Sequence, residues 1–152
     1  MNAEKKIQLS EVLVSTGHFL DAADYDSYLD LFCDDAEYQV VSYVPEIASE
    51  DVWMDYTKSE LQHLLNEEPY HHWNTGQRTH FISTPLFENT TPEVSTLASV
   101  VIYRTDTDGR TDIYAVGQYK DNWIESKLGW RLKKRVLHLA TRDLVPPSAI
   151  PL

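Results

Sequence analysis

The sequence contains a single cysteine, Cys33, among its 152 residues. One thiol excludes a disulfide within the chain, a four-cysteine zinc site and any iron–sulfur cluster held by this chain alone. The longest apolar runs, such as 100–103, fall far short of the ~20 residues that a membrane span needs. The first residues lead into an amphipathic stretch rather than the apolar segment of a signal peptide. We therefore expect a protein of a reducing compartment, the cytoplasm.

Basic residues are also few in this sequence. Lys and Arg number 13 against 24 Asp and Glu, which gives a net charge of −11 and a pI near 4.8. A surface of this charge repels phosphate, so nucleic acid and anionic membranes are not expected as partners. The charge does not exclude another protein as a partner.

The chain is nonetheless rich enough in apolar residues to fold by itself. Apolar residues make up 42% of the sequence and aromatic residues 11%, which excludes a disordered protein. A chain of this length buries roughly 68–70% of its unfolded surface, so a core can form without disulfides or metals. We expect one domain over 1–152, with the first helix starting within 1–18 and an extended tail over 144–152.

Three helices are predicted in the first half of the chain. An apolar stripe at spacings of three and four residues marks the first: Leu9, Val12, Leu13, Thr16, Phe19 and Leu20. The second begins at Asp24 as N-cap, continues through Phe32 and should close at 34–35. The third opens at 57–60, which fits a capping box, and continues towards Pro69.

The rest of the chain is predicted to be mostly sheet. Strand-forming residues fill 37–43, 78–83, 93–105, 113–124 and 130–141. Short turns join the last three into an antiparallel meander, and Gly109 stands in the first turn where a positive φ is needed. Within the last strand the apolar alternation changes parity. We therefore predict a β-bulge near Lys133 and Lys134 that restores a common inner face.

Helices followed by long antiparallel strands define an α+β class. We expect three helices packed into the concave face of a strongly curved, mixed or antiparallel sheet. This arrangement forms a cone whose interior can hold either core side chains or a small ligand.

Six segments, taken together and in order, follow the pattern of a known family: 19–32, 35–38, 78–83, 103–104, 114–121 and 129–135. They resemble the small (β) subunits of aromatic-ring-hydroxylating dioxygenases. The closing residues 149–152 are similar to those of terephthalate-type small subunits. The resemblance covers roughly 19–143 in order, and the segment 41–53 departs from the family's pattern. It implies the cone fold called nuclear-transport-factor-2-like, or SnoaL-like.

The resemblance implies a place in a multicomponent Rieske non-haem iron dioxygenase that acts on aromatic compounds, with aromatic acids as the expected class. In this family the large (α) subunit carries the Rieske 2Fe–2S cluster and the mononuclear iron. The β subunit is a structural partner without a cofactor or metal, in an α3β3 assembly. Independently, a Rieske centre needs two cysteines and two histidines, and this chain has one cysteine. For the chain alone we expect a homotrimer.

His80 keeps a second function open. Some proteins of this cone fold are dehydratases or isomerases that use a histidine with an aspartate inside the cavity, and others only bind a small ligand. The candidates to orient the His80 imidazole are Asp24, Asp30 and Asp121, with Tyr25 or Tyr43 as proton donor. The alternative is that His80 is a buried, hydrogen-bonded histidine of the core. A shifted pKa would favour the catalytic role.

The meander supplies the candidates for a subunit interface. Five residues of its strands are predicted to lie on the exposed convex face of the sheet: Arg104, Asp121, Trp123, Trp130 and Arg135. Charges paired across neighbouring strands stabilise a sheet, and arginine and tryptophan are enriched where proteins meet. We expect the homotrimer to be built on this face. Cys33 is expected to be a buried, unreactive thiol.

Overall fold

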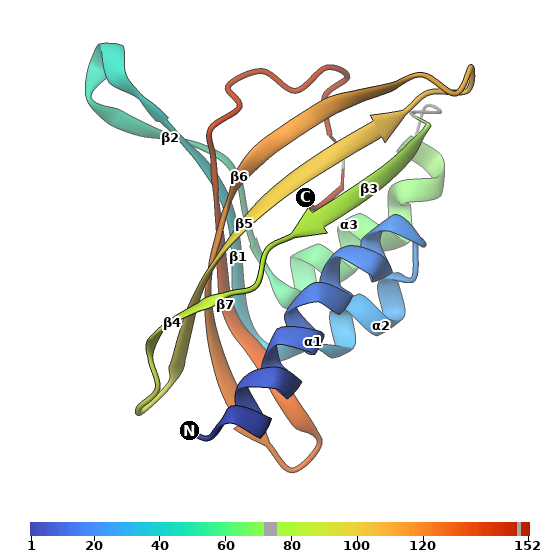
Figure 1. The fold of residues 1–152 in the computed structure, drawn as a ribbon. Coiled ribbons are helices and arrows are strands. Elements are labelled where there is room, and N and C mark those ends of the chain that lie inside the picture. Colours follow the sequence, from blue (N-terminus) through green and yellow to red (C-terminus); the bar gives the residue numbers. More distant parts are fainter. Residues whose placement is uncertain (72–75, 149) are drawn as a thin grey trace.

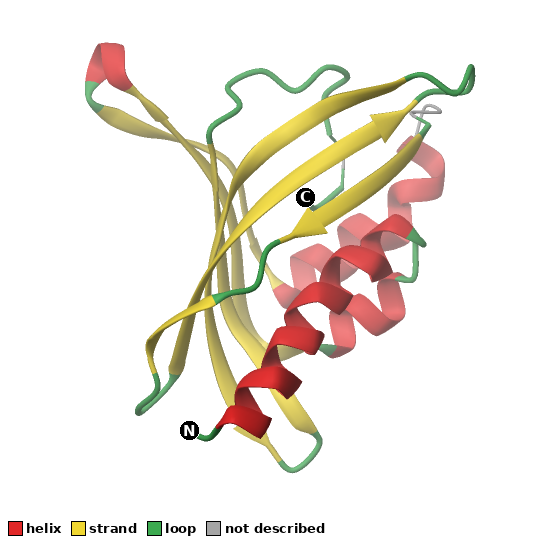
Figure 2. Ribbon diagram, viewed as in Figure 1, coloured by secondary structure: helices red, strands yellow, loops and turns green. Residues whose placement is uncertain are grey.

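The computed structural model describes residues 1–71, 76–148 and 150–152, and it consists of helices packed on one curved sheet (Figures 1 and 2). The elements in chain order are α1 (Ala3–Asp21), α2 (Tyr25–Asp30), β1 (Phe32–Val44), the 3₁₀ turn η1 (Pro45–Ile47), β2 (Ser49–Thr57), α3 (Lys58–His71), β3 (Gln77–Ile82), β4 (Leu86–Asn89), β5 (Val94–Thr105), β6 (Thr111–Ser126) and β7 (Gly129–Leu139).

The sheet has seven strands in the order β2-β1-β7-β6-β5-β3, and β4 pairs with β5 beside β3. The pair β1–β7 is parallel and the other pairs are antiparallel. All three helices lie on the concave side of the sheet, where α1 packs on β3 and α3 packs on β1 (Figure 2). The predicted α+β cone with a curved, mixed sheet is confirmed.

The helix starts follow the caps that the sequence predicts. The Asp24 carboxylate accepts a hydrogen bond from the Ser27 backbone N–H at 3.3 Å and so caps α2. At the start of α3 the Thr57 hydroxyl accepts from the Glu60 N–H at 3.2 Å, and the Glu60 carboxylate accepts from the Thr57 N–H at 3.3 Å. This reciprocal pair is a capping box, which satisfies two N–H groups that a helix leaves unpaired at its start.

Two predicted helix ends were wrong, and one strand was not predicted. The second helix ends at Asp30 rather than at 34–35, because Phe32 is buried and pairs with Leu132 as the first residue of β1. The segment 41–53, which departs from the family's pattern, forms most of the β1–β2 hairpin; the strand predicted over 37–43 lies within β1, and β2 was not predicted. The third helix continues through Pro69 to His71. In the first two cases long-range strand pairing decided what local pattern could not.

The predicted β-bulge in the last strand is confirmed. Asn122 of β6 pairs with Lys134, but Trp123 pairs with Leu132, so Lys133 is the extra residue of β7. The bulge lets Leu132 and Arg135, which are three residues apart, both point into the interior. Gly109 has the expected positive φ, +82°, in the turn between β5 and β6.

The tail over 144–152 forms no strand in its described part, yet it is packed against the cone rather than projecting from it. Leu144, Ile150 and Leu152 are buried among the core residues. The Tyr38 hydroxyl on β1 donates to the Leu152 carbonyl at 3.1 Å and accepts from the Leu152 N–H at 2.8 Å. The chain end therefore lies on the concave side of the sheet, near β3 (Figure 1).

Candidate functional site

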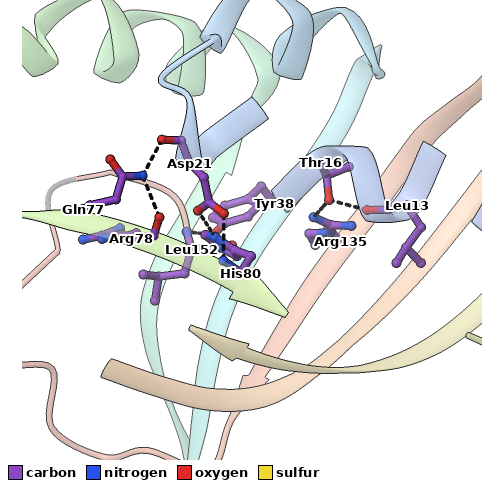
Figure 3. Close-up of polar contacts among 9 residues, drawn as sticks. All are labelled: Leu13, Thr16, Asp21, Tyr38, Gln77, Arg78, His80, Arg135 and Leu152. Carbon is purple, nitrogen blue, oxygen red and sulfur yellow. Dashed lines mark hydrogen bonds and ion pairs between the residues drawn. The ribbon is translucent and has the colours of Figure 1, made fainter. Parts of the chain in front are cut away.

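The interior of the cone holds two groups of polar side chains, and helix α1 contributes to both (Figure 3). One joins the end of α1 to strand β3. The other joins the middle of α1 to strands β6 and β7. Every titratable residue in them needs a partner, since a buried polar group without one costs free energy.

Asp21 and His80 form the first group. The Asp21 carboxylate accepts from the His80 backbone N–H at 2.7 Å, and its other oxygen lies 2.5 Å from Nδ1 of the His80 ring. The Gln77 side chain donates to the Asp21 backbone carbonyl at 2.9 Å. Because Asp21 is the last residue of α1, these bonds also tie the helix end to β3. The carboxylate fixes the ring and its Nδ1 side, so Nε2 points elsewhere.

A glycine makes this approach possible. Gly17 lies one helical turn before Asp21, and a Cβ atom placed on Gly17 would stand 2.8 Å from Cβ of His80. No real side chain fits such a distance, so any larger residue would push α1 away from β3. Gly17 thus sets the spacing at which Asp21 can reach the imidazole.

The pair has the arrangement of a general base held by a carboxylate, but it is closed to solvent. The His80 side chain is 1% exposed. Its Nε2 atom is buried and has no hydrogen-bond partner among the described residues. A substrate would have to reach Nε2 to exchange a proton with it. In this structure the pair therefore fixes α1 on β3, and the interior around it must open before it can act as a base.

Arg135 and Asp121 form the second group. Arg135 donates from Nε and Nη2 to the two Asp121 carboxylate oxygens at 2.9 and 2.8 Å. Its Nη1 donates to the Thr16 hydroxyl at 3.0 Å, and its guanidinium lies 3.9 Å from the centre of the Tyr119 ring. Both charged side chains are 0% exposed. The bidentate pair with Asp121 and the bond to Thr16 thus give the buried guanidinium three hydrogen bonds.

Burial also shows in the acidities of this group. It raises the pKa of the Asp121 carboxyl above its ordinary value, and the adjacent Arg135 charge opposes that shift. Burial raises the pKa of Tyr28 to about 12, although Arg135 again opposes the change. Burial likewise raises the pKa of Tyr119. Both phenols therefore stay protonated near neutral pH, and both rings are buried in the core.

The C-terminal tail closes the cone on the side of β3 and β6. Arg78 of β3 donates to the Ser148 hydroxyl at 2.9 Å, and its guanidinium lies 4.9 Å from the centre of the Tyr114 ring. The Tyr114 hydroxyl donates to the Pro146 carbonyl. Together with the bonds between Tyr38 and Leu152 in Figure 3, these contacts hold the tail against three strands.

The residues proposed to act with His80 do not surround it. The carboxylate bound to His80 is that of Asp21; Asp121 is bound to Arg135 instead. Asp24 is exposed and caps α2, and Asp30 is exposed at the end of that helix. Tyr25 is half-buried in the first turn of α2. Tyr43 is exposed and pairs with Glu50 in the β1–β2 hairpin. None of the three acids predicted to orient the His80 imidazole does so, and Asp21 takes that place.

The predicted interface residues are mostly inside. Trp123 and Trp130 are buried, as are Asp121 and Arg135, so none of these four lies on the convex face. Their strands, β6 and β7, are in the middle of the sheet rather than at its edge. Asp121 and Arg135 do pair across strands as expected, but on the concave side.

Arg104 is the fifth predicted interface residue, and it does not extend that pair. It is half-buried on β5, where its neighbours in register are Arg78 and Asp112.

Sequence reasoning missed Asp21 and Thr16. A usable signal was present, because Leu13, Gly17 and Asp21 follow at spacings of four and so share one face of the helix. A glycine inside a helical stripe marks a close approach, and it would have placed Asp21 against a strand.

Two features of the described residues bear on cofactors and membranes. No group of three or more His, Cys, Asp or Glu in the described ranges is arranged to hold a metal ion. No helix among them is long and apolar enough to span a membrane. His72, part of a histidine-rich stretch of the sequence, lies outside the described residues.

Comparison with known proteins relates this geometry to a family. Residues 2–136 match the model of the SnoaL-like domain. The chain is 30% identical over 139 residues to the β subunit of 2-aminobenzenesulfonate 2,3-dioxygenase from an Alcaligenes species, across 91% of this chain and 93% of that protein. This chain belongs to the family of ring-hydroxylating dioxygenase β subunits, which has the SnoaL-like fold.

Solved structures agree with this assignment. The β subunit of a protein assigned as an aromatic-ring-hydroxylating dioxygenase from Novosphingobium aromaticivorans has 25% identity and a TM-score of 0.81, covering 91% of this β subunit and 90% of that chain. A chain of naphthalene 1,2-dioxygenase shares the fold with a TM-score of 0.80 at 18% identity, covering 100% and 88%. The resemblance to β subunits that the sequence segments indicated is thus confirmed.

Proposed function

We propose that this chain is the β subunit of a terminal oxygenase and that it supports assembly without a reaction centre of its own. Its partner is a large (α) subunit that carries the Rieske cluster and the mononuclear iron, in an α3β3 complex of the cytoplasm. The substrate class is an aromatic acid. The similarity to the subunit of an enzyme named for 2-aminobenzenesulfonate, an aromatic sulfonic acid, supports this class.

One observation carries the assembly role: the interior of the cone is occupied by the chain's own residues. On one side lie Arg135 and Asp121, which are joined by two hydrogen bonds. On the other side Leu152 is anchored to Tyr38, and His80 exposes 1% of its side chain. An enzyme that worked inside this cone would need its base open to a substrate. An interior occupied by the chain's own side chains suits a structural partner.

Reconstitution tests the proposal. We expect the isolated chain to turn over no aromatic acid, and turnover to appear when the large subunit and a reductase are added. We also expect the large subunit to co-purify with the chain. The variant His80→Ala should retain turnover in the reconstituted complex, because His80 has a structural role. Turnover by the isolated chain would contradict the proposal, and so would a large subunit that is fully active and stable without this chain.

The Asp21–His80 pair supports a second candidate, a stand-alone dehydratase or isomerase. In that case the tail must leave the cone so that Nε2 becomes accessible. The variant Asp21→Asn then abolishes activity of the isolated chain along with His80→Ala, whereas the exposed Asp24→Asn does not. If neither Asp21→Asn nor His80→Ala changes an activity of the isolated chain, that activity does not use this pair.

A further inference from the structure

Two arginines lie directly opposite each other near the start of β3 and the end of β5. Arg78, seen on β3 in Figure 3, pairs in register with Arg104 of β5. Residues opposite each other in an antiparallel pair share one face of the sheet, with Cβ atoms about 5 Å apart. The face is the concave one, because the next pair on it, His80 and Ile102, is buried. Like charges in this position repel each other.

The ring of Tyr114, on β6, shows that the two guanidinium groups converge. The Arg78 guanidinium lies 4.9 Å from the centre of this buried ring. Burial raises the pKa of Tyr114, and both Arg78 and Arg104 oppose that shift. Both positive charges therefore lie close to the same phenol, in one region on the concave side of the sheet.

Neither arginine has an acidic partner in the part of the chain that the structure describes. The ion pairs between described residues include neither Arg78 nor Arg104. Asp112, the other neighbour of Arg104 in register, is exposed and forms no ion pair with it. Burial lowers the pKa of Arg78, and the groups that oppose this shift most are tyrosines, Tyr114 first. The chain has 24 acidic residues, so a shortage of acids does not explain two unpaired cations.

Some N–H groups of the two side chains also lack an acceptor. Arg78 donates from Nη2 to the Ser148 hydroxyl at 2.9 Å, but its Nη1 atom is buried without a hydrogen-bond partner among the described residues. The Nε atom of Arg104 is buried and unpaired in the same sense. A buried donor without an acceptor costs free energy, and the cost is larger for a charged group. The missing partner is an acceptor that carries negative charge.

An oxyanion supplies both the charge and the acceptor atoms. The guanidinium group is planar, has five N–H donors and binds the oxygens of a carboxylate or a sulfonate through paired hydrogen bonds. One such ion between Arg78 and Arg104 accepts from both unpaired nitrogens and cancels their repulsion. A free ion fits this place better than an acidic side chain of another protein, because the unpaired atoms are buried and Ser148 of the tail is bound to Arg78.

We propose that Arg78 and Arg104 form a binding site for a small oxyanion, a carboxylate or a sulfonate, that ties β3 to β5 beneath the C-terminal tail. The site belongs to this chain alone and goes beyond the assembly role proposed above. The ion binds where folding brings the two arginines together, so it stabilises the folded chain.

Thermal unfolding of matched variants tests the site. In a chloride buffer Arg104→Gln should melt at the wild-type temperature or above it, because the change removes a repulsion and breaks no ion pair. An arginine with a purely structural role would instead lower the melting temperature. Sodium sulfate or sodium acetate, at about 100 times its dissociation constant, should raise the wild-type melting temperature by roughly 5–10 °C. Arg104→Gln should show no such rise over chloride of equal ionic strength.

Arg110→Gln is the matched control, because Arg110 is exposed in the β5–β6 turn and the variant loses the same unit charge. It should keep the full response to both ions. Sulfate stabilises folded proteins in general by its exclusion from their surface, so the difference between the two variants is the quantity that counts. If Arg104→Gln does not fold, Arg104→Lys replaces it and should bind roughly tenfold more weakly, because an ammonium group cannot form the paired hydrogen bonds.

The same measurements separate a free ion from an acidic side chain of the large subunit. A rise that depends on Arg104 and not on Arg110 supports the site. No rise in the wild type, or an equal rise in Arg104→Gln, overturns it. The free ion is also overturned if neither ion acts but the large subunit raises the melting temperature of the wild type and not that of Arg104→Gln, because an acid of that subunit then occupies the site.

Discussion

Replacing Arg135 by methionine removes one partner of the buried ion pair and keeps a side chain of similar length. The Asp121 carboxylate then remains fully buried without its two hydrogen bonds from the guanidinium, which measure 2.9 and 2.8 Å. Breaking a buried pair in this way destabilises a protein by about 3–5 kcal/mol. For a chain of this length that corresponds to a fall in the melting temperature of roughly 6–20 °C.

Urea unfolding followed by circular dichroism measures this loss, and an exposed ion pair provides the control. Lys134 stands next to Arg135 in the sequence and pairs with Glu37 at 3.2 Å, and the two side chains are 43% and 58% exposed. Lys134→Met should cost at most about 1 kcal/mol. Combining Arg135→Met with Asp121→Leu should recover much of the loss, because the unpaired charge is then removed as well.

The dependence on pH gives an independent check. Burial already raises the Asp121 pKa in the wild type, and removal of the Arg135 charge that opposes this raises it further. A carboxyl whose folded pKa exceeds its unfolded pKa binds protons on folding, so its penalty shrinks as the pH falls. The gap between Arg135→Met and the wild type should therefore be smaller at about pH 5 than at about pH 8. A loss below about 1 kcal/mol at both pH values would refute the view that this pair is a desolvated part of the core.

Three further predictions concern the tail, the α1–β3 contact and the thiol. Tyr38→Phe leaves the Leu152 N–H and carbonyl buried without their partner, which should cost about 1–3 kcal/mol in urea unfolding and speed amide exchange of the tail; unchanged exchange would argue against the anchor. Gly17→Ala should destabilise the fold by about 1–3 kcal/mol, because the added methyl group clashes with His80. At an exposed helix position the same change would stabilise the helix. A gain in stability would therefore contradict the close approach of α1 to β3. Cys33 should react with a thiol reagent more slowly than free cysteine near neutral pH, because burial raises its pKa, and unfolding in urea should remove the difference.

The sequence predicted best what is decided within a few residues. The capping box at 57–60 and the N-cap Asp24 depend on side chains that bond their own backbone neighbours, and both formed as expected. The bulge at Lys133 was also predicted, because a change of parity in one strand is visible without knowing its partner. Most strands of the meander followed for the same reason, since alternation records one buried face.

What failed depends on contacts between distant segments. Asp21 reaches His80 across 59 positions of sequence, and the helix stripe alone does not say which strand it meets. Strand β2 has few buried residues, so it lacks the alternation that marks a strand; its pairing with β1 makes it one. The tail has no pattern of its own, and its place follows from Tyr38, which is 114 positions away from Leu152.

The bulge at Lys133 decides which side chains of β7 point into the cone and which lie on its convex side. Side chains of a strand alternate between faces, so a shift of one residue exchanges them. Because Lys133 is the extra residue, Arg135 points inward to Asp121, while Val136 and His138 point outward. Without the bulge, pairing in the register of Trp123 and Leu132 would send the Arg135 charge outward and the apolar Val136 inward. One irregular position thus encloses the Arg135 charge in the core and leaves the side chains of Val136 and His138 on the convex side of the sheet.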